Sequence, residues 1–236
     1  MQIKLLTLNV QGRMNLDKIF PLFEKEQPDI LCLQEVFLED LEYMKDKYGY
    51  NFSFGASNNM LPDGLYQFGE AGLQGSAIVS KHEIESKETY FYRGEGNAPL
   101  YTGFLTPDKV VVIGVVKGIK IATTHFTLSR KGQFTVQQYT DFVNLMKQIN
   151  HNEKLILCGD FNSPRGGQMF SLFEEQFKDN LPKNVESTID PNLHRVKGLS
   201  LAVDTIFSRG YTVKDVRVIE GVSDHKCIIG MVTLPS

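Results

Sequence analysis

The sequence contains few of the residues that mark the special classes of protein. Among its 236 residues there are three cysteines and no tryptophan. Cys32, Cys158 and Cys227 each lie in an apolar run, and no two of them have the spacing of a metal-binding pair. We therefore expect three buried, reduced thiols. A chain of this length can bury about 70% of its unfolded surface, so it does not need disulfide bonds to be stable.

Long hydrophobic runs are also missing. No stretch approaches the roughly 20 apolar residues that a membrane-spanning helix needs. The apolar part of Met1–Val10 is too short for the hydrophobic region of a signal peptide. We therefore expect a soluble protein of the cytoplasm.

Neither sign of charge is in excess. Lys and Arg total 25 and Asp and Glu total 28, which gives a net charge of −3 at pH 7. Charged residues make up 22% and hydrophobic residues 42%, as in ordinary globular domains. This composition excludes a disordered chain, a collagen, a coiled coil and a strongly basic protein that wraps nucleic acid. Phosphate-bearing substrates remain compatible with it if local charge attracts them.

Short apolar runs rich in β-branched residues recur along the chain and predict strands. These runs lie at residues 3–8, 29–33, 50–54, 76–80, 89–92, 110–116, 119–124, 154–158, 202–207, 211–219 and 226–232. Helical spacing of apolar residues occurs at residues 16–23 (with Asn15 as the expected N-cap), 38–48, 135–150 and 168–177. The early alternation of strand and helix, followed by many strands, predicts a mixed α/β protein. No repeat or linker divides it, so we expect one domain over residues 1–236.

The segment Gly55–Gly75 differs from the rest because it is rich in Gly and Asn. Loops of this length are uncommon unless they are functional or disordered. We expect a loop here, with Tyr66 and Phe68 at least half exposed, and both a lid over the substrate and a plain surface excursion remain open.

Polar residues interrupt or follow the apolar runs, and most of them stand at the carboxyl end of a run. A carboxylate in such a place is costly to bury unless it is paired, hydrogen-bonded or bound to a metal. If the strands form two stacked sheets, these ends can converge on one cleft. The residues concerned are Asn9, Glu35, His125, Asp160, Asn162, Asp204, Asp224 and His225.

The chemistry of this set favours a hard cation. Oxygen ligands without a thiolate suit Mg²⁺ or Mn²⁺ better than zinc. The set holds no nucleophilic Ser or Cys between suitable partners, while its two histidines can transfer protons or stabilise charge. These components suit metal-assisted attack of water on a phosphate ester.

Six motifs carry a family resemblance. In chain order they are LNVQG, LQEV, TTHF, GDFNSP, VDTIF and SDH, and the strand GLQGSAIVSK fits the same pattern. The series resembles the endonuclease/exonuclease/phosphatase superfamily, and it runs from Asn9 to His225. The resemblance implies a DNase I-like four-layer α/β sandwich, in which two mixed β-sheets pack face to face with helices outside. It also implies a divalent-metal phosphoesterase whose site lies at one end of the sandwich.

The resemblance assigns three residues to the metal side of the site. Glu35 would be the principal metal ligand, with Asn9 beside it. Asp224 would serve the metal cluster or hold its neighbouring loop. Gln11 stands where several nucleases of the superfamily have Asp, and an amide is a poorer ligand, so we expect one metal ion rather than two.

The resemblance assigns the remaining residues to the reacting water and phosphate. Asp160 would position and deprotonate the water, and Asn162 would hold that water or a phosphate oxygen. His225, oriented by Asp204, would donate to the phosphoryl oxygens or transfer a proton. His125 stands where some members have a second catalytic histidine, which could protonate the leaving group or stabilise charge.

Two further side chains are candidate contacts to substrate. Arg165 follows the GDFNSP motif, so its loop should lie near the metal, and Gln11 lies beside Asn9. His82, His151 and His194 stand in polar surroundings, and we expect them to be solvated.

Three functions remain open from the sequence. The first is a Mg²⁺- or Mn²⁺-dependent phosphodiesterase or phosphatase that acts, as a monomer, on a small phosphorylated molecule or a lipid head group. The second is a DNA or RNA nuclease that uses the same site. The third is a catalytically silent binding module, which the complete set of matched residues disfavours. Substrate choice would lie in the loops at residues 55–75, 93–99 and 182–198.

Overall fold

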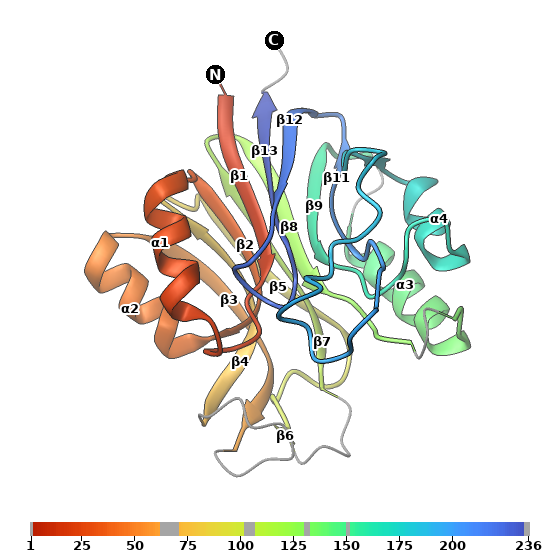
Figure 1. Ribbon diagram of the computed structural model, residues 1–236, viewed down its shortest axis with the longest axis horizontal. Helices are drawn as coiled ribbons and strands as arrows, with labels where there is room; N and C mark the ends of the chain where they lie inside the picture. Colours follow the sequence, from red (N-terminus) through yellow and green to blue (C-terminus); the bar gives the residue numbers. More distant parts are fainter. Residues whose placement is uncertain (1, 62–70, 102–106, 130–132, 150–151, 234–236) are drawn as a thin grey trace.

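The computed structural model describes residues 2–61, 71–101, 107–129, 133–149 and 152–233. Within these residues two mixed β-sheets lie face to face, and helices cover their outer sides (Figure 1). None of the described helices is long and apolar enough to cross a membrane.

The first sheet has seven strands in the order β12-β13-β1-β2-β4-β3-β6. β1 and β2 run parallel, as do β3 and β6, and the other neighbours are antiparallel. The strands are β1 (Gln2–Asn9), β2 (Ile30–Phe37), β3 (Asn51–Met60), β4 (Gly72–Ser80), β6 (Leu100–Tyr101), β12 (Thr212–Ile219) and β13 (Cys227–Thr233).

The second sheet has six strands in the order β10-β11-β9-β8-β7-β5. Only β8 and β9 run parallel in it. The strands are β5 (Ser86–Arg93), β7 (Lys109–Val116), β8 (Ile119–His125), β9 (Leu155–Asp160), β10 (Lys178–Asp179) and β11 (Asp204–Arg209).

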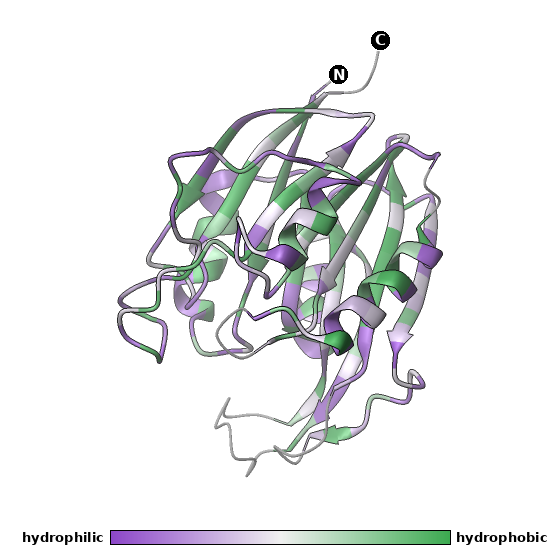
Figure 2. Ribbon diagram, turned by 90° about the vertical axis from the view of Figure 1, so that its right-hand side faces the viewer, coloured by the Kyte–Doolittle hydropathy of each residue, from purple (hydrophilic) through white to green (hydrophobic). Residues whose placement is uncertain are grey.

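Three apolar layers hold the sandwich together. Cys32 of β2 and Cys158 of β9 belong to the central layer between the sheets. The first sheet buries its other face under α1 (Leu16–Glu26) and α2 (Leu38–Tyr48). The second sheet does the same under α3 (Val136–Gln148) and α4 (Gln168–Glu174), which lie in front of largely hydrophobic strands in Figure 2. The expected four-layer α/β sandwich is confirmed, and all three cysteines are buried and free.

Each predicted strand and helix overlaps an observed one, but three details differ. α4 ends at Glu174 rather than near Phe177, and β11 begins at Asp204, so this carboxylate opens its strand instead of interrupting it. Asn15 precedes α1, but its side chain caps no backbone N–H. Its amide instead donates to Oε1 of Gln11, 3.3 Å away.

The expectation of a long loop at Gly55–Gly75 is wrong at both of its ends. β3 continues through Met60 and β4 begins at Gly72, so the two form an antiparallel hairpin. A Cβ at Gly75 would lie 1.9 Å from the carbonyl oxygen of Gly55, so this glycine permits the close approach of the strands. Tyr66, Phe68 and the possible lid lie outside the described residues, as does His151.

Gly159 has the conformation that places the next residue, Asp160, at the end of β9. Its φ is +145°, and a Cβ there would lie 2.0 Å from the carbonyl oxygen of Thr124 on β8. β8 and β9 could not then pair closely next to the polar end of the sheet. The residue before the candidate catalytic carboxylate must therefore be glycine.

We expect Gly159→Ala to lower the free energy of unfolding by more than about 2 kcal/mol, because it adds a backbone clash to an unfavourable φ. Denaturant unfolding measures this. Gly118→Ala is the control, since Gly118 also has a positive φ, +72°, but open space around its Cβ. Equal losses in the two variants would mean that the close approach at Gly159 has no energetic weight.

Candidate active site

Side chains from both sheets meet at the carboxyl ends of their strands. Asn9 ends β1 of the first sheet, and Asp160 ends β9 of the second. Nδ2 of Asn9 lies 3.2 Å from Oε1 of Glu35 and 3.2 Å from Oδ2 of Asp160. One buried amide therefore joins two carboxylates from opposite sheets, and this contact defines the centre of the site.

Glu35 reaches this centre because β2 is irregular. The register of β2 against β4 shifts between Leu33 and Val36, and Glu35 has a left-handed φ of 55°. A bulge of this kind turns a side chain away from the normal alternation of a strand. Without the bulge, the side chains of Glu35 and the buried Gln34 would point to opposite faces of the sheet, as in a regular strand. A non-glycine residue in this conformation is strained, and such strain gathers at functional sites.

Asp160 and Asn162 are held by their own local turn. The Asn162 backbone N–H donates to Oδ1 of Asp160 over 2.8 Å, and Asn162 has a left-handed φ of 49°. Its side-chain Nδ2 donates to the carbonyl of Phe126, 3.1 Å away. Oδ2 of Asp160 is thereby left to face Asn9 and the histidines.

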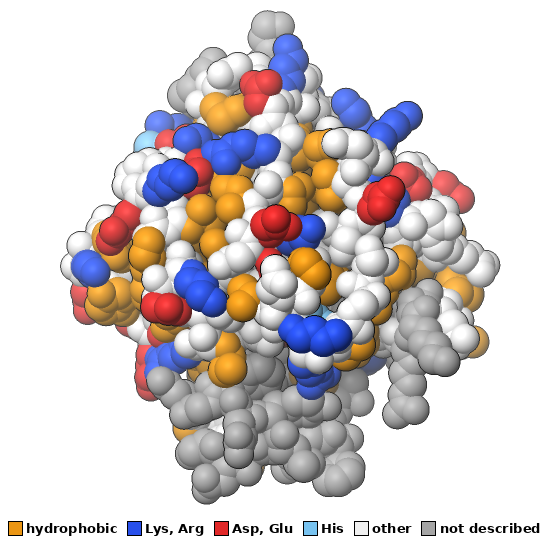
Figure 3. All heavy atoms as spheres, viewed as in Figure 1, with side chains coloured by type: hydrophobic (Ala, Val, Ile, Leu, Met, Phe, Trp, Pro, Cys, Tyr) orange, Lys and Arg blue, Asp and Glu red, His pale blue; other side chains and the backbone are white. Residues whose placement is uncertain are grey.

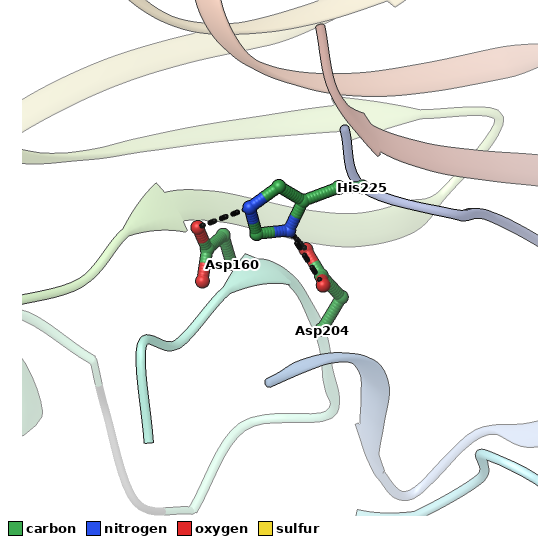
Figure 4. Close-up of side chains that lie close together, drawn as sticks. All are labelled: Asp160, Asp204 and His225. Carbon is green, nitrogen blue, oxygen red and sulfur yellow. Dashed lines mark hydrogen bonds and ion pairs between the residues drawn. The ribbon is translucent and has the colours of Figure 1, made fainter. Parts of the chain in front are cut away.

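His225 lies on the other side of Asp160 and pairs with Asp204 (Figure 4). Nδ1 of His225 lies 2.9 Å from Oδ2 of Asp204, and Nε2 lies 3.7 Å from Oδ2 of Asp160. The Thr188 hydroxyl donates to Asp204 over 2.6 Å and accepts the Asp204 backbone N–H. Asp204 therefore fixes the orientation of the imidazole and leaves Nε2 pointing at the carboxylate of Asp160.

His125 completes the group at the end of β8. Its Nδ1 lies 3.7 Å from Oε1 of Glu35, and its Nε2 lies 3.4 Å from Oδ2 of Asp160. His125 pairs with Asp160 in the parallel register of β8 and β9, so the register itself puts the two side by side.

The two histidines differ in charge near neutral pH. Burial disfavours the charged form of His225, but the carboxylates of Asp204 and Asp160 outweigh it and hold the pKa of His225 well above 6.5. Burial, helped by the ammonium of Lys109, lowers the pKa of His125 to about 3. At pH 7 the site therefore contains one imidazolium, His225, and one neutral imidazole, His125.

The oxygen-rich side of the site fits a hard cation. Burial raises the pKa of Glu35, against the hydrogen bond from Asn9, and the charge of Asp160 raises it further. Two carboxylates this close favour a cation that compensates their charge. Nδ2 of Asn9, not its oxygen, faces Glu35 and Asp160, so ligation there by the Asn9 oxygen would need the amide to turn over and give up the Gln11 N–H, now 3.1 Å from Oδ1.

A second group of possible ligands suits a cation less well. One ligand atom each from Asp160, Asp204 and His225 lies within 4.8 Å of the others. A histidine must be neutral to bind a metal, and His225 holds its proton between two carboxylates. This group therefore behaves as an ion pair, and Glu35 remains the best-placed ligand.

Asp224 and Gln11 lie at the edge of the centre. Burial raises the pKa of Asp224, against the charge of His225. The Asp224 carbonyl accepts the Asp190 N–H over 2.8 Å, which ties the segment after Thr188 to the loop of His225. Gln11 has a left-handed φ of 56°, and its side-chain oxygen accepts from Asn15. The contact with Asp190 is made by the backbone of Asp224 and does not involve its carboxylate, so both roles expected for Asp224 remain predictions.

The structure does not favour Arg165 as a phosphate contact. Its guanidinium donates to the carbonyls of Leu181, Pro182 and Val185 and pairs with Asp179 at 2.8 Å. These contacts use the side chain to fix the loop after α4. An arginine close in sequence to a catalytic motif need not face the substrate.

Two residues near the centre, Thr188 and Lys109, were missed from the sequence. Thr188 orients Asp204, as described above. Lys109 is only 6% exposed and donates to the carbonyls of His125 and Phe126, each at 3.0 Å. The ring of His194, expected to be solvated, lies 6.4 Å from that of His225. Each lies in a segment with no recognisable motif, so only the fold brings it to the site.

The comparisons with known proteins agree with this geometry. The model of the Endonuclease/Exonuclease/phosphatase family matches residues 6–225, so the chain belongs to this family. Comparison with the curated proteins gives no match.

Solved structures of the same family share the fold. A family protein from Leptotrichia buccalis is 18% identical with a TM-score of 0.71, over 98% of this chain and 100% of that one. The human Nocturnin catalytic domain with bound sulfate is 17% identical with a TM-score of 0.72, over 99% and 94%. D. rerio TDP2 complexed with single strand DNA product is 15% identical with a TM-score of 0.69, over 99% of each chain.

We expect Asp204→Asn to lower the pKa of His225, because it removes the nearest compensating charge. The charged pair stabilises the fold fully below pH 6.5 in the wild type and is lost as the pH rises through the raised pKa. NMR titration of the imidazole measures the shift. Asp46→Asn, at an exposed position of α2, is the matched control, and an unchanged His225 in Asp204→Asn would contradict the pairing.

Proposed function

We propose that the protein is a Mg²⁺- or Mn²⁺-dependent hydrolase of phosphate esters. One observation carries the proposal: the Asn9 amide holds Glu35 and Asp160 together, and the His225 imidazolium faces the same oxygen of Asp160. A general base, a cation ligand and a positive donor thus surround one point. Membership of the family supports the same reaction class.

In this mechanism Asp160 positions a water molecule and takes its proton. Oδ1 of Asp160 accepts the Asn162 N–H, whereas Oδ2 faces Asn9 and both histidines at the centre of the site, so Oδ2 is the oxygen that would act as base. The Asn162 side chain, anchored by its Nδ2 on Phe126, would hold the water or a phosphate oxygen. These groups supply the positioning on which phosphoryl transfer to water chiefly depends.

The histidines serve the developing negative charge. His225, an imidazolium held by Asp204, would donate through Nε2 to a phosphoryl oxygen. His125 is neutral at working pH, so it would donate a hydrogen bond to the leaving oxygen rather than a full positive charge. Hydrogen-bond donors that are already in position before the reaction can stabilise the developing charge without a costly reorganisation of the site.

We propose that Glu35, with Asn9 beside it, holds a single cation. When bound, Mg²⁺ or Mn²⁺ would neutralise charge on the phosphoryl oxygens. Gln11 brings no carboxylate to this side and its oxygen already accepts from Asn15, which supports one cation rather than two.

The preferred substrate is a small phosphorylated molecule or a lipid head group. The net charge is −3, and on the face drawn in Figure 3 acidic and basic side chains are interspersed rather than grouped in a basic stripe. Nucleic-acid binding draws mainly on Lys and Arg contacts to phosphates. A nuclease remains the second candidate, because D. rerio TDP2, complexed with single strand DNA product, has a similar fold.

We also propose that residues 1–236 form one monomeric domain. The central apolar layer takes residues from Ile3 near one end of the chain to Val232 near the other. Such a core has no internal boundary.

We expect Asp160→Ala and His225→Ala each to lower kcat by about 10²- to 10⁴-fold, because each removes a proton-transferring or charge-stabilising group. The measurement is hydrolysis of bis(p-nitrophenyl) phosphate with added Mg²⁺ or Mn²⁺. Asp46→Ala on α2 controls for the loss of a carboxylate elsewhere. Rates near wild type in both site variants would refute the assignment.

We expect Glu35→Gln to raise the Mg²⁺ concentration for half-maximal rate by about tenfold or more, since the variant keeps the shape but loses the ligand charge. Chelation by EDTA should abolish turnover, and added Mg²⁺ should restore it. A Glu35→Gln variant with an unchanged metal dependence would remove Glu35 from the metal site.

A substrate panel separates the candidate functions. It contains nucleotides, phosphoinositides, sphingomyelin, and plasmid and abasic duplex DNA, each with Mg²⁺ and with Mn²⁺. Cleavage of DNA that falls steeply with salt would favour the nuclease. Failure on every phosphoester would favour a catalytically silent binding module.

A further inference from the structure

Lys109 is a buried cation that the proposed mechanism leaves without a role. It stands at the start of β7, where the pairing of β7 with β8 has already ended at Val111 and Thr124. Beyond that pair, the Lys109 side chain reaches the carbonyls of His125 and Phe126, and the Tyr92 hydroxyl of β5 also donates to the His125 carbonyl at 3.5 Å. The Lys109 ammonium donates to both carbonyls at 3.0 Å. A side chain here therefore takes the place of the backbone donors that pair β7 with β8 elsewhere.

The Phe126 carbonyl is shared between two donors. It accepts from Nζ of Lys109 at 3.0 Å and from Nδ2 of Asn162 at 3.1 Å. The backbone N–H of Phe126 donates to the carbonyl of Asp160 at 2.8 Å. The short segment His125–Phe126 is therefore the joint to which two polar side chains, those of Lys109 and Asn162, and the backbone of Asp160 are attached.

The Asn162 amide depends on this joint for its direction. An amide is planar, and a carbonyl can only accept, so the bond to Phe126 fixes which end of the amide carries the N–H groups. The Asn162 oxygen and its second N–H then point in defined directions. If the Phe126 carbonyl turned, both groups would turn with it.

The charge of Lys109 is compensated by the site. Burial lowers the pKa of Lys109 to about 8, while the carboxylates of Asp160, Glu35 and Asp141 favour its charged form. Lysine is still mainly an ammonium at pH 7, and an ammonium makes stronger hydrogen bonds to carbonyls than a neutral donor does. At 6% exposure, with its ammonium held by two carbonyls, Lys109 is placed to act on the joint rather than on substrate.

We propose that Lys109 is a positioning residue of this active site: its ammonium fixes the carbonyls of His125 and Phe126, and the Phe126 carbonyl in turn orients the Asn162 amide. The inference rests on the proposed hydrolysis for its kinetic consequence, but not for its structural one. The proposed role differs from a contribution to stability alone, because Lys109 acts through the orientation of one side chain, the Asn162 amide.

We expect Lys109→Met to lower kcat by about 10- to 100-fold with little change in KM, as for other residues that orient a catalytic group. Lys120→Met is the matched control, because Lys120 lies in β8 of the same sheet and pairs with Glu153. Lys109→Arg keeps the charge and should recover most of the loss. Equal kcat values for Lys109→Met and wild type would overturn the proposal.

A double-mutant cycle tests the route through Asn162. In an Asn162→Ala background, Lys109→Met should change kcat by less than about threefold, because the group it orients has gone. Fully multiplicative losses in the double variant would contradict the route. If Lys109→Met does not fold, Lys109→Gln, which keeps a polar donor, replaces it in the same cycle.

The closing measurement does not depend on turnover. The side-chain amide of Asn162 gives ¹⁵N–¹H signals that should shift in Lys109→Met and stay near their wild-type positions in Lys120→Met. Unshifted Asn162 signals in Lys109→Met would refute the positioning role even if the protein hydrolyses phosphoesters. Shifted signals in a protein without any phosphoesterase activity would support the positioning role and refute the proposed function.

Discussion

The contact of the Asn9 amide with two carboxylates is the interaction on which the site depends. Glu35 belongs to one sheet and Asp160 to the other, so the site exists only where the sheets are held at the correct separation. The central apolar layer sets that separation with close-packed strand side chains. Packing in the middle of the sandwich and chemistry at its end are therefore parts of one arrangement.

The charge balance of the site depends on where the charged side chains lie rather than on equal numbers of positive and negative groups. Glu35, Asp160 and Asp204 lie close together, and the imidazolium of His225 is held between the last two. The ammonium of Lys109 compensates from the buried side, behind the His125–Phe126 joint. The side of Glu35 is left with the greatest need for a cation. This asymmetry is what would allow the proposed oxygen ligand and a charged histidine to lie within one small cluster.

Much of the fold and of the site could be predicted from the sequence, for identifiable reasons. Residues such as Asp160 and His125 end strongly apolar strands, so their polarity stands out against the pattern. Thr188 and Lys109 carry no such signal, because each lies outside the motifs and meets the site only through sheet pairing and loop closure. Arg165 shows the opposite case: it is a charged residue beside a motif, but its partners are backbone carbonyls and Asp179. The full length of the hairpin of β3 and β4 was not predicted, because its Gly and Asn residues are typical of loops rather than of strands.

The left-handed backbone of Glu35 has a consequence for how this protein can be improved. Glycine adopts that conformation without strain, so a screen that rewards only heat resistance would favour glycine at position 35. The same exchange would delete the one carboxylate that the bulge in β2 presents to the centre of the site. Under the proposed function, stability and activity therefore compete at a single backbone position, and a survey of thermostable variants would reveal the competition as a loss of function without a loss of fold.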